Sequence, residues 1–252
     1  MNRQTFSREG FITDLSRRIL EPEEVIGGEE GVKYANRKDD RTLTFRMVAF
    51  DVVERAHLTV DSRILEVCCG AGQLVHELSK FVKPQNIIAV DGSKELIEIA
   101  KSRYGSDGIR FEVQNVHDLN VPGNFDCVVC KDSFHHFPDP KTAIVELMKP
   151  LKNGGLLYIF DLVRNASDES INTRQSAILD DHEAMRFLRS VNASLITKEF
   201  IQVVSELGLN IEVIYPLTYS EANKKNNEES IKLDKIKEIN TADLFAVYLL
   251  RN

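Results

Sequence analysis

A glycine-rich turn between an apolar run and a helical pattern is the stretch of this sequence best suited to binding a ligand. Residues 64–67 form an apolar run typical of a buried strand, and residues 73–78 have the apolar spacing of a helix. Between them, Gly70 and Gly72 permit backbone conformations and close approaches that a Cβ atom would block. A strand, a glycine turn and a helix N-terminus in this order form a corner that binds nucleotides. Asp91 follows about 20 residues later, where a carboxylate can accept hydrogen bonds from both hydroxyls of a ribose.

Two consecutive histidines, His135 and His136, follow a later apolar run and are the candidates for proton transfer. Imidazole titrates near neutral pH, so either side chain is able to act as a general base toward a substrate hydroxyl. The alternative is that one histidine packs or caps the following loop and that neither takes a proton. Asp161 closes another apolar run, where it either holds a substrate or caps a turn.

The four cysteines are Cys68, Cys69, Cys127 and Cys130. The pair Cys127-x-x-Cys130 has a spacing found in zinc and redox sites, but it lies in an apolar run typical of a central strand. Side chains three apart on a strand point to opposite faces, and no second Cys/His pair has the spacing of a zinc site. We therefore predict no metal site, and we predict reduced, buried thiols, which agree with a reducing compartment.

Apolar runs and helical patterns alternate along the middle of the chain. The predicted strands cover residues 64–67, 87–90, 109–114, 125–130 and 156–160. This alternation predicts an α/β fold with a Rossmann-like, doubly wound sheet, mostly parallel and covered by helices on both faces. Two further strands, at 211–214 and 244–250, lack a full crossover helix between them. We therefore expect seven strands, of which the last is antiparallel. Ser93, Asp139 and Thr197 are the predicted N-caps of three helices in this region.

The residues before this alternation are predicted to cover the sheet. Residues 3–20 have an amphipathic helical pattern, and residues 41–58 have a second one with a wide apolar face. Residues 21–40 contain three glycines and a proline and are predicted to form a loop. We therefore expect a helical cap over residues 1–58 and one domain over residues 59–252.

Two stretches of that domain interrupt the alternation of strand and helix. Residues 164–196 are polar and lie where the carboxyl edge of the sheet needs a cover, which predicts a lid or insertion. Residues 218–241 are rich in lysine and glutamate, which predicts an exposed excursion.

The composition is that of an ordinary globular protein, with 42% hydrophobic and 28% charged residues. A formal net charge of -7 argues against a nucleic-acid partner, because nucleic-acid binding favours a basic surface. No apolar run approaches the roughly 18 residues that a membrane span requires. The first residues lack the apolar core of a signal peptide, so we expect a cytoplasmic protein. The oligomeric state stays open.

The glycine turn departs from two widespread nucleotide motifs. In the spacing Gly70-x-Gly72-x-x-Val75, a valine stands where the dinucleotide fingerprint requires glycine or alanine. No Gly-Lys-Ser/Thr follows the turn, which excludes a P-loop.

Several motifs in order resemble those of the class I S-adenosylmethionine-dependent methyltransferases, small-molecule branch, with a domain like that of the ubiquinone and menaquinone methyltransferases. The run Glu66-Val67-Cys68-Cys69-Gly70-Ala71-Gly72 resembles the first motif of that family, and Asp91 stands where the family holds the ribose. The remaining matches are residues 114–119, 125–129, 135–139, 151–155 and 159–161. The resemblance implies the same sheet, S-adenosyl-L-methionine as cofactor and methyl transfer by in-line displacement.

The resemblance also assigns roles to the residues that bind the cofactor. Glu66 is expected near the methionine ammonium and Asp91 on the ribose, while Asn115 and Val116 flank the adenine. The backbone at Lys131 is expected to contact the methionine end. The complete predicted set is Glu66, Gly70, Gly72, Asp91, Gly92, Asn115, Val116 and Lys131.

The sequence departs from the family pattern at two positions. Cys68 replaces the first glycine of the first motif, and Asn115 stands where aspartate is common. A small side chain is tolerated at the first position, and an asparagine carbonyl still accepts a hydrogen bond from the adenine amino group.

The predicted function is methyl transfer to a small-molecule acceptor, which releases S-adenosylhomocysteine. His135 and His136 leave the fourth strand toward the expected acceptor, so they are the candidate catalytic residues. Two alternatives stay open: a non-catalytic cofactor-binding or regulatory protein with the same fold, and a methyltransferase that acts on protein or RNA. The identity of the acceptor is not specified by the sequence.

Overall fold

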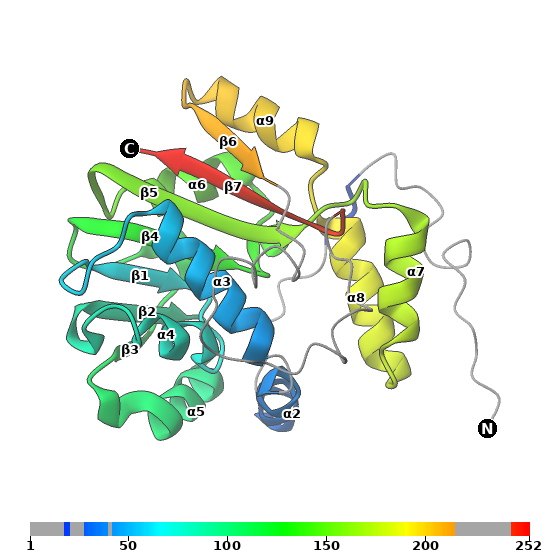
Figure 1. The fold of residues 1–252 in the computed structure, drawn as a ribbon. Helices are drawn as coiled ribbons and strands as arrows, with labels where there is room; N and C mark the ends of the chain where they lie inside the picture. Colours follow the sequence, from blue (N-terminus) through cyan, green and yellow to red (C-terminus); the bar gives the residue numbers. More distant parts are fainter. Residues whose placement is uncertain (1–17, 21–27, 40–41, 215–242) are drawn as a thin grey trace, which may run out of the picture.

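A computed structural model describes residues 18–20, 28–39, 42–214 and 243–252 (Figure 1). Most of the helix predicted over residues 3–20, and the excursion predicted over 218–241, lie outside these residues. The predicted division into a cap and a domain also stays a prediction. None of the helices in the described ranges is long and apolar enough to cross a membrane.

The described strands form one seven-stranded sheet in the order β3-β2-β1-β4-β5-β7-β6. They are β1 Ile64–Val67, β2 Ile87–Asp91, β3 Arg110–Val113, β4 Phe125–Lys131, β5 Leu151–Leu162, β6 Ile211–Ile214 and β7 Phe245–Arg251. Strands β1 to β5 are parallel to one another, and β7 is antiparallel to both β5 and β6. The predicted fold class, mostly parallel with an antiparallel last strand, is confirmed.

Helices and short 3-10 turns connect and cover these strands. The helices are α2 Gly28–Asp39, α3 Thr42–Arg55, α4 Gln73–Leu78, α5 Lys94–Tyr104, α6 Pro140–Met148, α7 Asp168–Ser176, α8 Asp181–Ala193 and α9 Thr197–Glu206. The turns are η1 Pro84–Asn86, η2 Gly105–Asp107, η3 Val116–Asp118 and η4 Phe134–His136.

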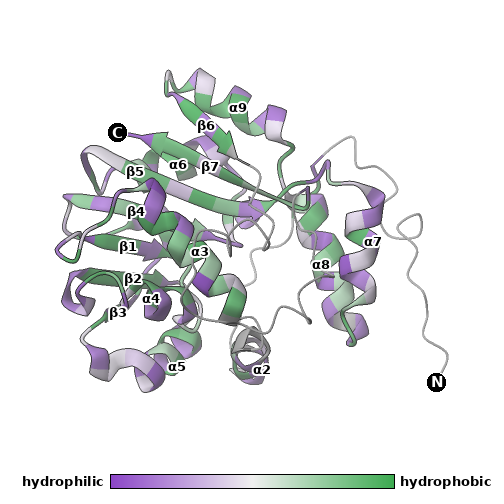
Figure 2. Ribbon diagram, in the orientation of Figure 1, coloured by the Kyte–Doolittle hydropathy of each residue, from purple (hydrophilic) through white to green (hydrophobic). Residues whose placement is uncertain are grey.

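The central strands are buried on both faces because a separate apolar core lies against each face. Along β4, Cys127 and Val129 belong to the core shared with α3, α4 and α5, whereas Val128 and Cys130 belong to the core shared with α6, α8 and α9. Figure 2 shows the strands as mainly hydrophobic ribbons between helices of mixed character. The two cysteines three residues apart thus face opposite sides of the sheet, as predicted.

Local capping residues begin most of the predicted helices where the sequence indicates. Ser93 Oγ accepts a hydrogen bond from the Leu96 backbone, and Asp139 caps α6 with Pro140 at its first position. The prediction for Thr197 is wrong by one residue. Ile196 occupies the N-cap, and its backbone N–H donates to the Glu199 carboxylate at 3.0 Å.

The loop predicted over residues 21–40 is wrong for its second half, which forms α2. Ala35 packs with Ala71 and Leu96, and its carbonyl accepts a hydrogen bond from Gln73 Nε2 at 3.3 Å. A helix of this length is marginal alone in water, so packing on the rest of the protein decides its structure. The prediction relied on the glycines of this segment and did not account for its tertiary contacts.

The predicted cover over residues 164–196 is largely helical. It contains α7 and α8, which Figure 1 shows side by side beyond the end of β5. Whether this pair moves as a lid stays a prediction.

Candidate active site

The carboxyl ends of the parallel strands bring the predicted residues to one edge of the sheet. Val67 of β1 is in register with Val90 of β2 and with Cys130 of β4, and Lys131 is in register with Phe160 of β5. Parallel strands in register end at the same edge, which is where open α/β sheets bind their ligands.

The turn after β1 is held to the end of β2 by a carboxylate. Gly70 N donates to Asp91 Oδ2 at 2.8 Å, and Ser93 N donates to Asp91 Oδ1 at 2.8 Å. Each oxygen retains acceptor capacity for a further donor. Gly72 has a φ of 83°, and a Cβ there would lie 3.0 Å from the Phe111 ring. Glycine is thus required at this position both for its backbone conformation and for space.

Cys68 occupies a left-handed backbone conformation, with a φ of 55°, at the position where the family motif has glycine. A non-glycine residue in this conformation costs about 1 kcal/mol or more. The sequence departure at Cys68 therefore places strain in the turn itself.

We expect Cys68→Gly to raise the free energy of unfolding by about 1 kcal/mol, because glycine adopts this conformation without that strain. Chemical denaturation measures the change. Cys69→Gly is the matched control, because Cys69 is buried and is not among the positive-φ residues. The control should lose about 1 kcal/mol through lost burial and added chain entropy. Equal destabilisation by both substitutions would contradict the strain.

Glu66 lies buried near the end of β1, with 3% of the residue exposed. Its Oε2 has no hydrogen-bond partner among the described residues. Burial raises the pKa of Glu66 to about 8, with Asp91 raising it further and Lys131 opposing the rise. A ligand ammonium would supply the missing partner and favour the ionised carboxyl. The residues present therefore fit the methionine end of S-adenosylmethionine.

The predicted adenine residues lie beside the end of β2. Gln114 N donates to the Asp91 carbonyl at 3.0 Å, which holds the start of η3 next to Asp91. Asn115 caps η3, its Oδ1 accepting from His117 N at 2.9 Å. Val116 is buried at the same place, whereas Gly92 is exposed. Asn115 Oδ1 already accepts a hydrogen bond from His117 N. The side-chain NH2 group of Asn115 is therefore the stronger candidate for contact with adenine.

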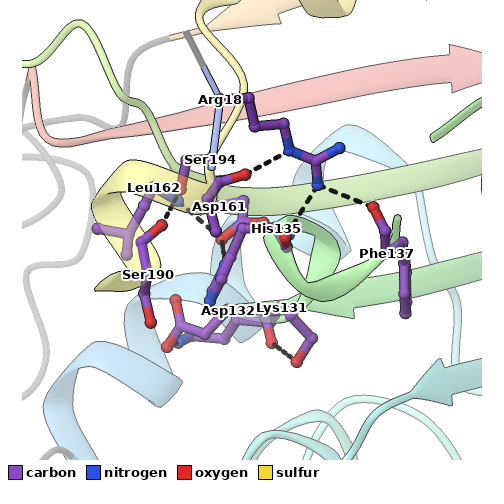
Figure 3. Close-up of polar contacts among 11 residues, drawn as sticks. Arg18, Lys131, Asp132, His135, Phe137, Asp161, Leu162, Ser190 and Ser194 are labelled. Atoms are coloured by element: carbon purple, nitrogen blue, oxygen red, sulfur yellow. Dashed lines mark hydrogen bonds and ion pairs between the residues drawn. The ribbon is translucent and has the colours of Figure 1, made fainter. Parts of the chain in front are cut away.

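His135 and Asp161 form a buried pair at the ends of β4 and β5 (Figure 3). His135 Nδ1 lies 2.7 Å from Asp161 Oδ1, and His135 N donates to Asp161 Oδ2 at 2.6 Å. Leu162 N also donates to Oδ1, at 2.8 Å. An ionised carboxylate only accepts, so Nδ1 carries the hydrogen and Nε2 is the nitrogen able to accept a proton.

His136 differs from His135 in its surroundings. Its ring lies against that of His135 at a tilt of 44°, with 4.1 Å between centroids, and its side chain is more exposed. The structure thus separates the two candidates: His135 is oriented by a carboxylate, and His136 packs against it.

The side chain of Lys131 is a feature that sequence reasoning missed, because the resemblance implied only a backbone contact. The side chain is 5% exposed, pairs with Asp132 and lies over the rings of Phe45 and Phe160 at 4.9 and 5.1 Å. Asp132 has a φ of 53°, a conformation that clusters at functional sites. The sequence signal was the charged pair directly after an apolar strand.

No group of three or more His, Cys, Asp or Glu residues within the described ranges could hold a metal ion. Cys68 is partly exposed, and the other three cysteines are buried.

Comparison with known proteins agrees with this geometry. Residues 65–159 match a family described as a methyltransferase domain. The chain is 31% identical over 114 residues to the methyltransferase YcgJ of Bacillus subtilis (strain 168), covering 44% of each protein. It is 33% identical over 121 residues to a ubiquinone biosynthesis O-methyltransferase of Xanthomonas campestris pv. campestris (strain B100), covering 46% of this chain and 50% of that protein. The match therefore spans about half the length of these relatives.

Solved structures extend the likeness to most of the chain. The plantazolicin methyltransferase BpumL, in complex with a triazolic desmethylPZN analog and SAH, is 19% identical with a TM-score of 0.66. The alignment covers 88% of this chain and 89% of BpumL. Residues 65–159 therefore match a methyltransferase domain by sequence, and most of the chain shares the fold of the methyltransferase BpumL, which was solved with SAH bound.

Proposed function

We propose that this protein transfers a methyl group from S-adenosylmethionine to a hydroxyl of a small-molecule acceptor. The observation that carries the proposal is the buried His135–Asp161 pair beside the edge where the cofactor residues meet. When bound, S-adenosylmethionine supplies a methyl group on a sulfonium that needs no acid to leave.

The cofactor side of the site binds and orients. Glu66 receives the methionine ammonium, and Asp91 receives the ribose hydroxyls on the lone pairs left by Gly70 and Ser93. The backbone of the glycine turn approaches the ligand closely because Gly70 and Gly72 carry no Cβ. Alignment of donor and acceptor supplies most of the rate in a displacement of this kind.

The acceptor side of the site moves a proton. His135 Nε2 takes the proton of the acceptor hydroxyl, while Asp161 holds Nδ1–H and stabilises the imidazolium that forms. Methyl transfer to oxygen requires this proton to leave, so the pair favours a hydroxyl acceptor. The ubiquinone biosynthesis O-methyltransferases among the relatives are named for transfer to oxygen.

A small acceptor is supported by the surroundings and by charge. Helices α7 and α8 stand beyond the end of β5, where the sequence predicts a cover for the edge of the sheet (Figure 1). The net charge of -7 opposes an RNA substrate. The cytoplasm, which the sequence predicts, stays the proposed location.

Two measurements on the purified protein test the proposal. S-adenosylhomocysteine should raise the melting temperature, since a ligand at 100 times its Kd stabilises the folded state by about 2.7 kcal/mol. Asp91→Ala should abolish that rise. Labelled S-adenosylmethionine should then transfer label to a component of a small-metabolite extract.

Variants of the two histidines separate an enzyme from a binding protein. His135→Gln should lower the rate of label transfer by about a hundredfold or more while keeping the thermal shift. His136→Gln should retain most of the transfer rate. Binding without transfer to any extract would favour the regulatory alternative. Absence of a thermal shift would refute cofactor binding altogether.

A further inference from the structure

Arg18 joins the N-terminal side of the chain to the turn that carries His135 (Figure 3). Arg18 Nη2 donates to the carbonyls of His135 and Phe137, at 2.9 and 2.8 Å. Nε donates to the carbonyl of Ala193, the last residue of α8, at 2.5 Å. A single guanidinium therefore bridges the histidine turn and the insertion helix.

We propose that Arg18 is a positioning residue that locks η4 against α8 and so holds His135 in line with the acceptor. The inference rests on the proposed function, because it assigns Arg18 to the same proton-transfer site. Arg18 touches neither His ring nitrogen in any described contact and acts through the backbone on both sides of the ring.

The two sides of the histidine turn need different anchors. Asp161 holds the His135 backbone N–H and the ring from β5. The carbonyls of His135 and Phe137 are held separately, because both accept from Arg18. Removing the guanidinium takes away the hydrogen bonds that hold the carbonyls of His135, in the three-residue turn η4, and of Phe137, which follows it.

The C-terminus of α8 is held by two arginines at adjacent carbonyls. Arg18 binds Ala193 O, and the buried Arg164 binds Ser194 O at 3.1 Å while its Nη2 pairs with Glu199 at 2.6 Å. Cations at a helix C-terminus are also favoured by the helix dipole. Ile19 N donates to the Asn192 carbonyl at 3.2 Å, which extends the same attachment by one residue.

The charges around Arg18 are those of the same site. Burial lowers the pKa of the Arg18 guanidinium, and the negative charges of Asp161 and Glu199 partly oppose this effect. Arg18 thus compensates part of the charge of the carboxylate that orients His135.

The first test is spectroscopic and needs no acceptor. In protein labelled with 15N-histidine, the Nδ1–H of His135 bonded to Asp161 should give a downfield proton signal protected from exchange, assigned by its loss in His135→Gln. In Arg18→Gln, which can bind only one of the carbonyls well, this signal should broaden or disappear. Arg18→Lys keeps the positive charge but lacks the planar guanidinium with its several donors, so it should give an intermediate loss of the signal.

The second test is the rate of transfer to the extract component identified above. Arg18→Gln should lower that rate by about a hundredfold, the cost of a misplaced reacting group, with binding of S-adenosylhomocysteine unchanged. Arg63→Gln is the matched control. Arg63 also binds a backbone carbonyl, that of Gly123, at 2.9 Å. It precedes β1 and therefore lies at the opposite edge of the sheet from the histidine turn. It should leave both the rate and the histidine signal unaltered.

The outcomes separate this inference from the proposed function. A folded Arg18→Gln or Arg18→Lys protein with an unchanged His135 signal would refute the positioning role, whatever the activity. A lost signal in a protein that transfers no label even as wild type would support the lock and refute the proposed reaction. If Arg18→Gln fails to fold, Arg18→Lys alone decides.

Discussion

Glu66→Gln is expected to weaken cofactor binding about a hundredfold while making the ligand-free protein more stable. Glutamine cannot become anionic, so it gives the methionine ammonium no countercharge, and affinity for S-adenosylhomocysteine should fall about a hundredfold. The substitution breaks no hydrogen bond of Oε2 in the ligand-free protein, because this buried atom has no partner among the described residues. A substitution that weakens binding yet raises stability is a signature of a residue retained for function.

The effect on stability depends on pH with a definite sign. The pKa of Glu66 in the folded protein is about 8, above its ordinary value of 4.5. Below the ordinary value both folded and unfolded chains hold the proton, and the substitution is neutral. Between the two values only the folded protein holds it, so stability falls as pH rises. Near pH 7 the relief from Glu66→Gln should amount to roughly 1 to 3 kcal/mol, and it levels off above about pH 8.

Denaturation at several pH values, with and without S-adenosylhomocysteine, measures both effects. Affinity of the wild type should rise with pH up to about pH 8, by at most about tenfold per pH unit, because binding favours the ionised carboxyl. Glu77→Gln is the matched control. Glu77 is also buried, but it pairs with Lys80 at 2.7 Å and Arg46 at 3.3 Å. Its replacement should destabilise the protein and spare binding. Destabilisation by both substitutions would contradict our account of Glu66.

Asp161→Asn should lower the rate of methyl transfer by a factor of about 10³ to 10⁴ while preserving cofactor affinity. Asp161 accepts from three donors: His135 N, the His135 ring and Leu162 N. An asparagine amide replaces one acceptor oxygen with a donor, so at least one of these donors faces an N–H. The imidazole then loses the partner that fixes its tautomer and stabilises its charged form.

The rate of label transfer, with the thermal shift on S-adenosylhomocysteine, separates catalysis from folding here. Asp51→Asn is a suitable comparison, because Asp51 accepts from the Tyr158 hydroxyl at 2.8 Å on α3, outside the histidine turn. It should cost stability without a comparable loss of rate. An unimpaired rate in Asp161→Asn would exclude His135 as an Asp-oriented base.

The sheet was predictable because its strands are short apolar runs between strong turn signals. Every described strand except β5 begins within one residue of its predicted start, and the antiparallel pair followed from the missing crossover helix. α2 was not predictable from its own residues, because its burial comes from Ala71 and Leu96, which are distant in sequence. Local pattern therefore identified the layers of the fold and failed where tertiary contacts decide.

The site likewise contains contacts that the sequence pattern predicts and contacts that only the tertiary structure reveals. Asp91 and the glycine turn are adjacent in space because successive parallel strands end together, which the alternation of strand and helix already implies. The partnership of His135 with Asp161 required the β4–β5 register, and the contribution of Arg18 required a contact between residues more than 100 apart. Backbone carbonyls are the partners of Arg18, and no side-chain pattern in the sequence indicates them. The strain at Cys68 was visible only as a missing glycine until its φ was known.

The position of β7 between β5 and β6 has a consequence for how the chain folds as it is synthesised. β6 pairs only with β7 among the described strands, yet it is complete about 30 residues earlier, a delay of a few seconds on the ribosome. In that interval both β6 and the apolar edge of β5 present unpaired N–H and C=O groups to solvent and to other nascent chains. The strand that comes last in chain order closes both edges at once. Until it arrives, the half-built sheet is the state of this protein most exposed to aggregation and to the need for a chaperone.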